Sequence, residues 1–491
     1  MGVEIVSTGG TAEALAEAGV AVRPIDDLTG FPEIMDGRVK TLNPKLYAGL
    51  LARRDDPAHM EQAAEHGIEF VDLVCVNLYP FEETVAREGV SAGAAIENID
   101  IGGPTMVRAA AKNFPFTAIV TDPAQYGEVS AALAAGDGTL SIELRERLAA
   151  EAFALTARYD AAISSWFGAH SEGFPARLAR SWEKRLDLPY GENPHQAAAY
   201  YAQPGAASGV LADASQLHGK ELSFNNILDL EGARATLAEL GDEAPACVIV
   251  KHNNPCGAAR GETVLEAYRK AFAGDPVSAF GGIIALNRPI DAGTAQALSE
   301  QFIEVLVAPG YDPAALEKLT EKPDVRVLEA PGDGLPPAGS WELRPVAGGL
   351  LVQEHDSVVA ARDAMEVVSA RQPTGQEWLD LVFAWQVCRH VKSNAIVVAR
   401  DQATLGIGAG QMSRVDSVKI ALGREWIGDT DGLVLASDAF FPFADGPRAA
   451  IEGGAGALIQ PGGSIRDEEV IAAVDELGAA MVLTGRRHFR H

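Results

Sequence analysis

The chain has 491 residues, 68 of them acidic and 40 basic, which gives a formal net charge of −28 at neutral pH. A general nucleic-acid binder is expected to be basic, and adhesion to anionic membranes needs cationic patches, so the charge argues against both classes. Hydrophobic residues make up 47% and charged residues 22% of the chain, as in folded globular proteins, and this length predicts about two or three domains. The acidity itself is most simply explained by solubility.

Export, membrane insertion and a metal centre are all unexpected. No apolar run reaches the ~18 residues of a membrane span, and the N-terminus lacks a basic stretch followed by an apolar one. The four cysteines (Cys75, Cys247, Cys256 and Cys388) form no C-x-x-C pair, so neither a zinc site nor a disulfide framework is predicted. We therefore expect a cytoplasmic protein with reduced thiols and no bound metal.

In chain order, short apolar runs alternate with segments whose apolar residues recur at helical spacing. The first candidate strand covers residues 2–7. Further strands are expected at residues 71–78, 116–121, 247–250, 282–286, 305–308, 395–399, 432–437 and 480–484. Helices are expected, among other places, at residues 123–135 and 142–169. This alternation predicts an α/β fold with buried, mainly parallel strands.

A change of composition marks the candidate domain boundary. Residues 173–188 are rich in Arg and Lys with apolar residues between them. We place the boundary near residue 180, which gives domains of residues 1–180 and 181–491. The Pro/Gly-rich stretch 330–339 is a second possible break.

Two motifs near the N-terminus have the composition of an anion site. Ser7-Thr8-Gly9-Gly10-Thr11 lies between a strand and a helix, where glycines and hydroxyls can bind phosphate, although Gly-Gly turns after strands are common. In an extended segment, Arg38 and Lys40 would face one side, beside Thr41, and could grip an anion. The alternative for this pair is a solvated basic edge.

Two more polar turns lie in the first domain; the first ends a predicted strand, and the second leads into a helix. One is Asn77-Leu78-Tyr79-Pro80-Phe81, and the other contains Asp100 followed by Gly102 and Gly103. Ligands of open α/β sheets bind at the carboxyl ends of strands, where both turns are expected. Asp100 has the alternative role of a helix cap.

The second domain contains an adjacent acid/base pair. Lys251 and His252 follow an apolar strand, and a neighbouring cation favours the neutral imidazole that acts as a base. The alternative is a histidine whose ring only satisfies its turn. A polar loop, residues 190–196, precedes this pair and is dense in functional groups.

Further candidate elements lie near the C-terminus. Residues 406–410, Gly-Ile-Gly-Ala-Gly, lack the glycine spacing of a dinucleotide site, so a tight turn near a ligand is favoured. Residues 440–443 contain three phenylalanines that suit either the core or a flat heterocycle, and residues 461–464 form a small-residue anion turn. The basic terminus, residues 486–491, directly follows a strand, so it is either frayed or held in place.

Together, the ordered motifs resemble one family, the bifunctional AICAR transformylase/IMP cyclohydrolase, from residue 2 to residue 491. They are STGGT, MDGRVKTL, NLYPF, NIDIGG, YGENPHQ, KHNNPCG, DPVSAFGG, KSNAI, GIGAGQMSR, SDAFFPF, PGGS and RHFRH. The resemblance implies a methylglyoxal-synthase-like first domain and a transformylase domain of two zinc-free cytidine-deaminase-like subdomains. It also implies a homodimer with transformylase sites at the interface, acting on small-molecule nucleotide and folate substrates.

For formyl transfer from 10-formyltetrahydrofolate to AICAR ribonucleotide, the resemblance implies His252 as general base and Lys251 as the group that stabilises developing charge. The implied folate-binding residues are Phe280, Gly281, Asn394, Phe440, Pro442 and Arg414. The implied substrate-binding residues of this domain are Tyr190, Arg487 and His491.

For ring closure of the formylated product to IMP, the resemblance implies Lys40, Tyr79, Asp100 and Lys112 as the groups that handle protons and the oxyanion. The implied nucleotide-binding residues are Ser7, Thr8, Gly9, Gly10, Thr11, Arg38, Thr41, Asn77, Gly102 and Gly103.

The sequence departs from the family pattern in three places. Family members begin with a strand and a Ser-rich loop, and this sequence starts after both. We therefore expect that its N-terminus is truncated or that its start was misassigned. Three histidines of the first domain are replaced by Asn43, Tyr47 and Phe114, and Pro189 stands where an Arg grips the substrate phosphate. The alternatives are therefore a monofunctional transformylase with an inactive first domain, or a non-catalytic nucleotide-binding module.

Overall fold

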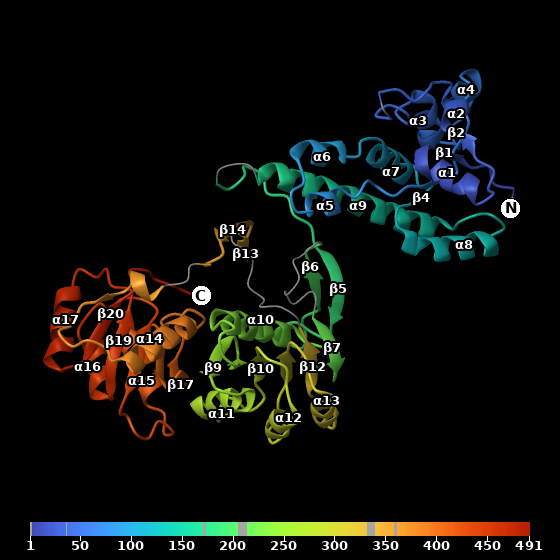
Figure 1. The fold of residues 1–491 in the computed structure, drawn as a ribbon. Coiled ribbons are helices and arrows are strands. Elements are labelled where there is room, and N and C mark those ends of the chain that lie inside the picture. Colours follow the sequence, from blue (N-terminus) through green and yellow to red (C-terminus); the bar gives the residue numbers. More distant parts are fainter. Residues whose placement is uncertain (1, 36, 170–172, 205–213, 331–338, 358–360) are drawn as a thin grey trace. The chain divides into compact units, whose positions relative to one another are not determined.

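The computed structural model describes residues 2–35, 37–169, 173–204, 214–330, 339–357 and 361–491 (Figure 1). The chain forms two compact units. The first comprises Met1–Glu183 and Gln203–Gly205, and the second comprises Lys184–Ala202 and Ala206–His491. Each unit has its own hydrophobic core and is described by itself.

The first unit is built around two short parallel strand pairs. β1 (Val6–Ser7) pairs with β2 (Arg23–Pro24), and β3 (Leu73–Cys75) pairs with β4 (Ala118–Val120). The strands expected at residues 2–7 and 71–78 are therefore present but shorter than predicted. The core around β4 is formed mainly by α3 (Pro44–Leu51), α7 (Gly102–Lys112) and α9 (Ile142–Gly168).

The other helices of this unit are α1 (Gly9–Glu17), α2 (Ile25–Thr29), α4 (Pro57–Glu65), α5 (Phe81–Val85), α6 (Ala92–Glu97) and α8 (Tyr126–Ala135). The helix predicted at residues 123–135 is α8 preceded by a 3₁₀ turn, Pro123–Gln125. The helix predicted at residues 142–169 is α9, and Ser141 caps it by accepting a hydrogen bond from the Leu144 amide.

The second unit contains one twelve-stranded sheet in the order β15-β20-β19-β18-β16-β17-β9-β8-β10-β11-β12-β7. Its strands are β7 (Ser215–His218), β8 (Ala246–Lys251), β9 (Asn254–Arg260), β10 (Ile283–Leu286), β11 (Val305–Ala308), β12 (Arg326–Glu329), β15 (Glu366–Val367), β16 (Ile396–Arg400), β17 (Ala403–Gly408), β18 (Leu433–Ser437), β19 (Ala455–Gln460) and β20 (Ala480–Leu483). All the strands predicted in this region are present, within one or two residues.

The prediction of mainly parallel strands is wrong for this sheet. Every pair from β18 to β10 across the centre is antiparallel, and parallel pairs lie only on either side of this block. The cause is a repeated unit. Each half of the sheet starts with a β-hairpin, β8–β9 or β16–β17, and continues through three helices that alternate with parallel strands. The two hairpins meet through β9 and β17.

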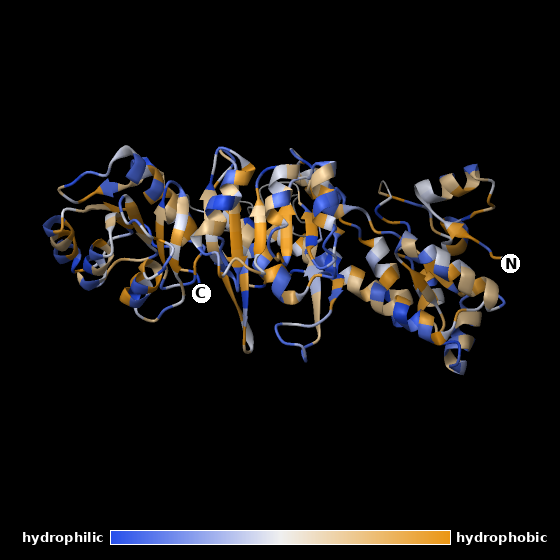
Figure 2. Cartoon of the chain, turned by 90° about the horizontal axis from the view of Figure 1, so that it is seen from below, coloured by the Kyte–Doolittle hydropathy of each residue, from blue (hydrophilic) through white to orange (hydrophobic). Residues whose placement is uncertain are grey.

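Helices cover both faces of this sheet, which explains why its strands are hydrophobic throughout (Figure 2). Along β8, Val248 and Val250 pack on one face in a core shared with α10 (Phe224–Glu239) and α14 (Gly375–Cys388). Cys247 and Ile249 pack on the other face. That face is covered by α11 (Val264–Gly274), α12 (Ala292–Leu298) and α13 (Pro313–Thr320) in one half. In the other half it is covered by α15 (Arg414–Leu422), α16 (Asp445–Glu452) and α17 (Asp467–Glu476).

Two small two-stranded sheets complete the second unit. β13 (Trp341–Val346) and β14 (Gly349–Glu354) form a hairpin, and β5 (Glu183–Leu188) pairs with β6 (Ala198–Ala202). Most of the possible break at 330–339 lies outside the described residues. No helix in the described part of the chain is long and apolar enough to span a bilayer.

The glycines at residues 406 and 408 serve helix packing. A Cβ atom at Gly406 would overlap the carbonyl oxygen of Ala421, and one at Gly408 would overlap that of Ser417, both in α15. These glycines therefore let α15 lie close against β17. Both glycines lie in β17 and have a structural role, so the prediction of a tight turn near a ligand at residues 406–410 is wrong for this part of the segment.

Replacing Gly408 by alanine is expected to destabilise the second unit by about 1–3 kcal/mol, because α15 must move away from β17. Gly375→Ala is the matched control, since a Cβ there meets nothing within 4 Å, and it should leave the melting temperature unchanged or slightly raised. Thermal melts of both variants test this packing role. Equal melting temperatures for the two would contradict it.

Candidate active sites

In the first unit, Asp100 holds two of the predicted turns together. Its Oδ1 accepts a hydrogen bond from the Gly103 amide at 2.8 Å, and its Oδ2 accepts one from the Tyr79 amide at 3.4 Å. Its own amide donates to the hydroxyl of Tyr159 at 2.8 Å. Asp100 thus binds the start of α7, as the capping alternative predicts, while its carboxylate remains only partly buried.

The two predicted anion-binding segments both lie near this helix start. A Cβ atom at Gly102 would lie 2.5 Å from the Thr41 hydroxyl oxygen, and one at Gly9 would lie 3.6 Å from the Lys40 ammonium nitrogen. The start of α1, the segment around Lys40 and the turn before α7 are therefore neighbours. This arrangement puts a cation and two glycine-containing helix starts, which favour an anion, beside a carboxylate that can accept a proton.

The prediction that Arg38 and Lys40 share one side of an extended segment is wrong. Ile34 and Val39 form a bridge that closes a tight turn, so the segment reverses direction. Arg38 forms an exposed ion pair with Glu97 of α6, whereas Lys40 lies near Gly9. The two cations thus have separate surroundings.

The remaining predicted residues of this unit have different positions. Tyr79 is 49% exposed. The side-chain amide of Asn77 donates a hydrogen bond to the Tyr126 hydroxyl at 3.4 Å. Ser7 ends β1, Thr8 precedes α1 without a side-chain capping bond, and Gly10 and Thr11 lie in its first turn. Lys112 is exposed in the last turn of α7, about 15 Å of helix from Gly102, so the structure does not bring it to the other three predicted catalytic groups.

The three histidine replacements have distinct surroundings. Asn43 caps α3 by accepting a hydrogen bond from the Lys45 amide at 2.9 Å, and Phe114 packs against the core. Tyr47 lies on α3, where burial raises the pKa of its hydroxyl to about 12 and the Asp100 carboxylate contributes to the rise. Tyr47 therefore stays protonated near the candidate site.

In the second unit, Lys251 and His252 lie at the tip of the β8–β9 hairpin. Lys251 pairs with Asn254, so His252 and Asn253 form a two-residue turn with φ of 53° and 60°. These are left-handed conformations, which this type of hairpin turn requires. The Lys251 ammonium donates to the carbonyl of Phe280 at 2.7 Å, which brings the predicted cation to the backbone of a predicted folate-binding residue.

Asp229, on α10, contacts the predicted acid/base pair and was missed by sequence reasoning. Its carboxylate accepts hydrogen bonds from the amides of His252 at 3.2 Å and Asn253 at 2.6 Å. It therefore fixes the turn that presents the exposed His252 ring. Asp229 belongs to no motif and lies 23 residues from His252, so only the folded structure relates the two.

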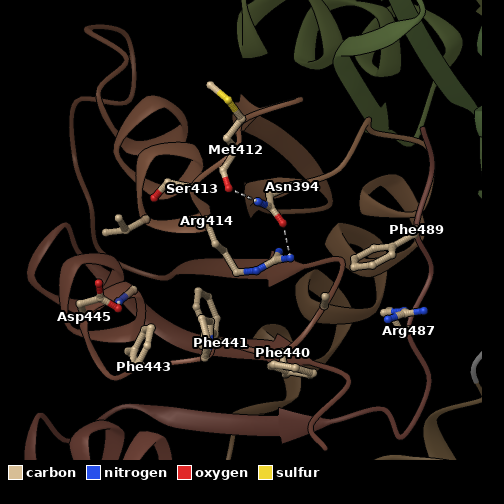
Figure 3. A pocket seen from close by; sticks show the side chains of 14 residues that line it. Asn394, Met412, Ser413, Arg414, Phe440, Phe441, Phe443, Asp445, Arg487 and Phe489 are labelled. Carbon is tan, nitrogen blue, oxygen red and sulfur yellow. Dashed lines mark hydrogen bonds between the residues drawn. The ribbon is translucent and has the colours of Figure 1, made fainter. Parts of the chain in front are cut away.

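A cavity of about 390 Å³ lies at the start of α15 (Figure 3). The Arg414 guanidinium donates to Asn394 Oδ1 at 2.7 Å. The side-chain amide of Asn394 donates to the backbone carbonyls of Gln411 at 2.9 Å and Met412 at 3.1 Å. Phe440 and Pro442 also line the cavity. Four of the predicted folate-binding residues thus meet at one site.

The aromatic turn that follows β18 divides its three rings between two environments. Phe441 is 1% exposed and belongs to the core, whereas Phe443 is 50% exposed beside the Arg466 guanidinium. All three rings line the cavity, and Phe441 belongs to the core as well. The two alternatives for these rings, core and ligand contact, are therefore compatible.

A buried carboxylate, Asp438, holds two residues of the cavity wall in place. Asp438 is 1% exposed and forms an ion pair with Arg414. Its carboxylate also accepts hydrogen bonds from the Ser393 hydroxyl at 2.5 Å and the Ala395 amide at 3.1 Å. These bonds fix Arg414 and the turn that carries Asn394.

The basic terminus is held in place. Arg487 and Phe489 line the cavity, and the Arg487 guanidinium lies 4.1 Å from the centre of the Phe489 ring (Figure 3). His488 is 4% exposed, and the carbonyl of His491 accepts a hydrogen bond from Arg344 of β13 at 2.8 Å. The frayed alternative is therefore wrong.

Lys251, His252, Phe280 and Gly281 do not line this cavity in the described part of the chain. The hairpin is nonetheless connected to it, because Asn254 Oδ1 accepts a hydrogen bond from the Lys392 amide at 3.0 Å. The loop that contains Tyr190 contacts the start of α10 through a hydrogen bond from Asn225 to the Glu192 carbonyl at 3.3 Å.

The prediction of an anion site at residues 461–464 is wrong. The amides of Gly463 and Ser464 donate to the carboxylate of Asp467 at 2.7 and 3.1 Å. A side chain of the protein already occupies the place of the anion. In the described residues, no group of three or more His, Cys, Asp and Glu side chains is arranged to hold a metal ion.

Comparison with known proteins defines the class first. Residues 1–105 match the MGS-like domain, and residues 110–424 match the AICARFT/IMPCHase bienzyme family. The chain belongs to the AICARFT/IMPCHase bienzyme family. This confirms the α/β fold class, with an MGS-like first part, that the motifs predicted.

Similar curated proteins cover the whole chain. The "Bifunctional purine biosynthesis protein PurH" of Roseobacter denitrificans is 53% identical over 100% of this chain and 94% of its own length. The protein of the same name from Cereibacter sphaeroides is 54% identical with the same coverage. A solved structure of ForH is 38% identical over 34% of this chain and 86% of its own, with a TM-score of 0.32.

These matches confirm the predicted activity. The chain is a bifunctional enzyme of purine biosynthesis, an AICAR transformylase and IMP cyclohydrolase. Full-length similarity to proteins that bear the bifunctional name does not favour the monofunctional alternative.

Proposed function

We propose that formyl transfer takes place at the tip of the β8–β9 hairpin, with His252 as general base and Lys251 as the stabilising cation. The observation that carries this proposal is the turn itself, which Asp229 fixes and from which Lys251 reaches the Phe280 carbonyl. The AICAR amine is a weak nucleophile, so an exposed imidazole beside a cation supplies what the reaction needs.

In the proposed step, the amine of AICAR ribonucleotide attacks the formyl carbon of 10-formyltetrahydrofolate. A C–N bond forms, the bond from the formyl carbon to N10 of the folate breaks, and the amine proton passes through His252 to the departing N10. Lys251 stabilises the oxyanion of the tetrahedral intermediate. Tetrahydrofolate and the formylated nucleotide leave.

The co-substrate is proposed to use the residues that the resemblance implies. Asn394 and Arg414 are polar groups held rigidly by their hydrogen bonds, and Phe440 and Phe280 offer faces for flat rings. Gly281 and Pro442 complete this set. Tyr190, Arg487 and His491 are proposed to bind AICAR ribonucleotide, with Arg487 taking part of the role of the arginine that Pro189 replaces.

We also propose a homodimer whose transformylase sites lie between two copies. The hairpin tip and the cavity are separate surface sites of one chain, and Phe280, Val277 and Met412 are 60%, 73% and 100% exposed. A second copy would bring the hairpin of one chain to the cavity of the other.

Mixing two inactive variants tests this arrangement. If His252→Asn and Arg487→Ala chains are co-refolded, heterodimers contain one intact shared site, and about one quarter of the normal formyl transfer should return. Each variant alone should remain inactive in formyl transfer. No recovery in a mixture that sedimentation shows to be dimeric would mean that each chain builds its own site.

For ring closure, Asp100 and Lys40 are proposed to move protons and stabilise the oxyanion at the start of α7. The carboxamide nitrogen attacks the formyl carbon, and water leaves. Tyr79 and Lys112 belong to the proposed set, with Lys112 needing a rearrangement of the site to take part. The turn from Ser7 to Thr11, with Arg38, Thr41, Asn77, Gly102 and Gly103, is proposed to bind the nucleotide.

The direct test of the overall function is a coupled assay with AICAR ribonucleotide and 10-formyltetrahydrofolate. The expected result is tetrahydrofolate and IMP in equal amounts. Tetrahydrofolate without IMP would contradict ring closure, and neither product would contradict the whole proposal.

A further inference from the structure

An ion pair lies buried at the C-terminal ends of α10 and α14. The Arg389 guanidinium donates to Glu239 Oε1 at 2.6 Å, and the two side chains are only 5% and 7% exposed. Burial alone would raise the pKa of Glu239, but the His390 ring, 3.9 Å from its carboxylate, and the Arg389 charge outweigh it and lower the pKa. No predicted catalytic step uses this pair.

Asp356 connects this pair to the C-terminal segment. Arg389 donates to the Asp356 carbonyl at 3.1 Å, and its guanidinium also lies 3.5 Å from the Asp356 carboxylate. The same carboxylate contacts Nδ1 of the buried His488. The His488 ring packs against Trp385 of α14, with ring centres 5.6 Å apart.

Backbone hydrogen bonds hold the same segment against the cavity wall. The His488 amide donates to the Asp438 carbonyl at 3.3 Å, and the Ser393 amide donates to the Arg490 carbonyl at 2.9 Å. The Arg490 guanidinium donates to the His390 carbonyl at 3.2 Å. The segment thus touches both Asp438 and the turn that carries Asn394.

The side chains of the segment alternate between two environments. His488 and Arg490 point into the protein, whereas Arg487 and Phe489 reach the cavity (Figure 3). This is the alternation of an extended chain. Whatever fixes His488 therefore fixes the positions of the two cavity-lining residues beside it.

We propose that Asp356, with the Glu239–Arg389 pair behind it, is a positioning residue for formyl transfer. It holds His488 and thereby sets Arg487 and Phe489 at the cavity. This inference rests on the proposed function, because it assumes that Arg487 binds the transformylase substrate. Glu239 keeps Arg389 in place and so supports Asp356 from the interior.

Asp356→Asn tests the proposal, because Asp356 is half-exposed and its loss should leave the fold intact. The KM for AICAR ribonucleotide should rise about tenfold while kcat changes little, as expected when a binding group loses its position. Asp356→Glu should restore part of the affinity. Ring closure should be unaffected.

A second measurement separates positioning from general stability. If Asp356 acts through Arg487, the two substitutions are coupled. In the inactive Arg487→Ala background, Asp356→Asn should therefore cause no further rise in the dissociation constant for AICAR ribonucleotide, measured by calorimetry. Asp242→Asn is the matched control, since Asp242 also pairs with an arginine, Arg288, and its KM should be normal.

Two results would overturn the inference. One is an unchanged KM in Asp356→Asn, and the other is independent, additive effects of Asp356→Asn and Arg487→Ala. Failure of the proposed function would look different, because formyl transfer would then be absent from the unmodified chain or would survive in His252→Asn.

Discussion

Replacing His252 by asparagine is expected to reduce formyl transfer by about 10²–10⁴-fold, the usual cost of losing a general base. Ring closure of the supplied formylated nucleotide should continue at its normal rate, because the first unit has its own core and its own candidate site. Asparagine suits this test because His252 has a left-handed backbone with φ of 53°, which asparagine tolerates. The Asp229 hydrogen bonds to the turn can therefore persist.

A second histidine provides the control for this experiment. His218 of β7 interacts with the Lys322 carbonyl at 3.1 Å and is not a predicted site residue. His218→Asn should retain both activities. Near-normal formyl transfer in His252→Asn would show that another group removes the proton.

Asp100→Asn is expected to reduce ring closure by about 10²–10⁴-fold and to leave formyl transfer unchanged. Asparagine keeps an oxygen that can accept the hydrogen bond from the Gly103 amide, so α7 should still begin at the same place. What the substitution removes is the charge and the capacity to take a proton. The measurement is the rate of IMP formation from the formylated nucleotide.

Asp122→Asn is the control in the same unit. Asp122 caps the turn before α8 by accepting a hydrogen bond from the Ala124 amide, so it has the capping role of Asp100 without a predicted catalytic one. Its variant should close the ring normally. If Asp100→Asn also closes the ring normally, Asp100 is only a helix cap.

The strands were predictable because their apolar runs are buried on both faces. Residues 305–308 match β11 without error, and the position of Lys251 and His252 at the end of a strand follows from the apolar run of β8. Strand direction was not predictable from these runs. A buried strand is apolar whether its neighbours are parallel or antiparallel, and only the repeated hairpins reveal the antiparallel centre.

The supporting carboxylates of the sites were also beyond sequence reasoning. Asp229, Asp356 and Asp467 act through contacts that depend on the fold, and none of them belongs to a motif. Asp467 explains why the anion site predicted at residues 461–464 was wrong. A glycine-rich turn that suits an anion can be occupied by a carboxylate of the protein itself. The role of Gly408 in packing α15 likewise needs the position of a helix that the sequence does not give.

The central claim is that the two units carry separate chemistry, with His252 serving one reaction and Asp100 the other. The most direct measurement is chromatography of the nucleotides formed from AICAR ribonucleotide and 10-formyltetrahydrofolate by the unmodified chain, His252→Asn and Asp100→Asn. The unmodified chain should yield IMP, His252→Asn should leave AICAR ribonucleotide unreacted, and Asp100→Asn should accumulate the formylated intermediate. Loss of both reactions in either variant, with the fold intact by thermal melting, would contradict the account.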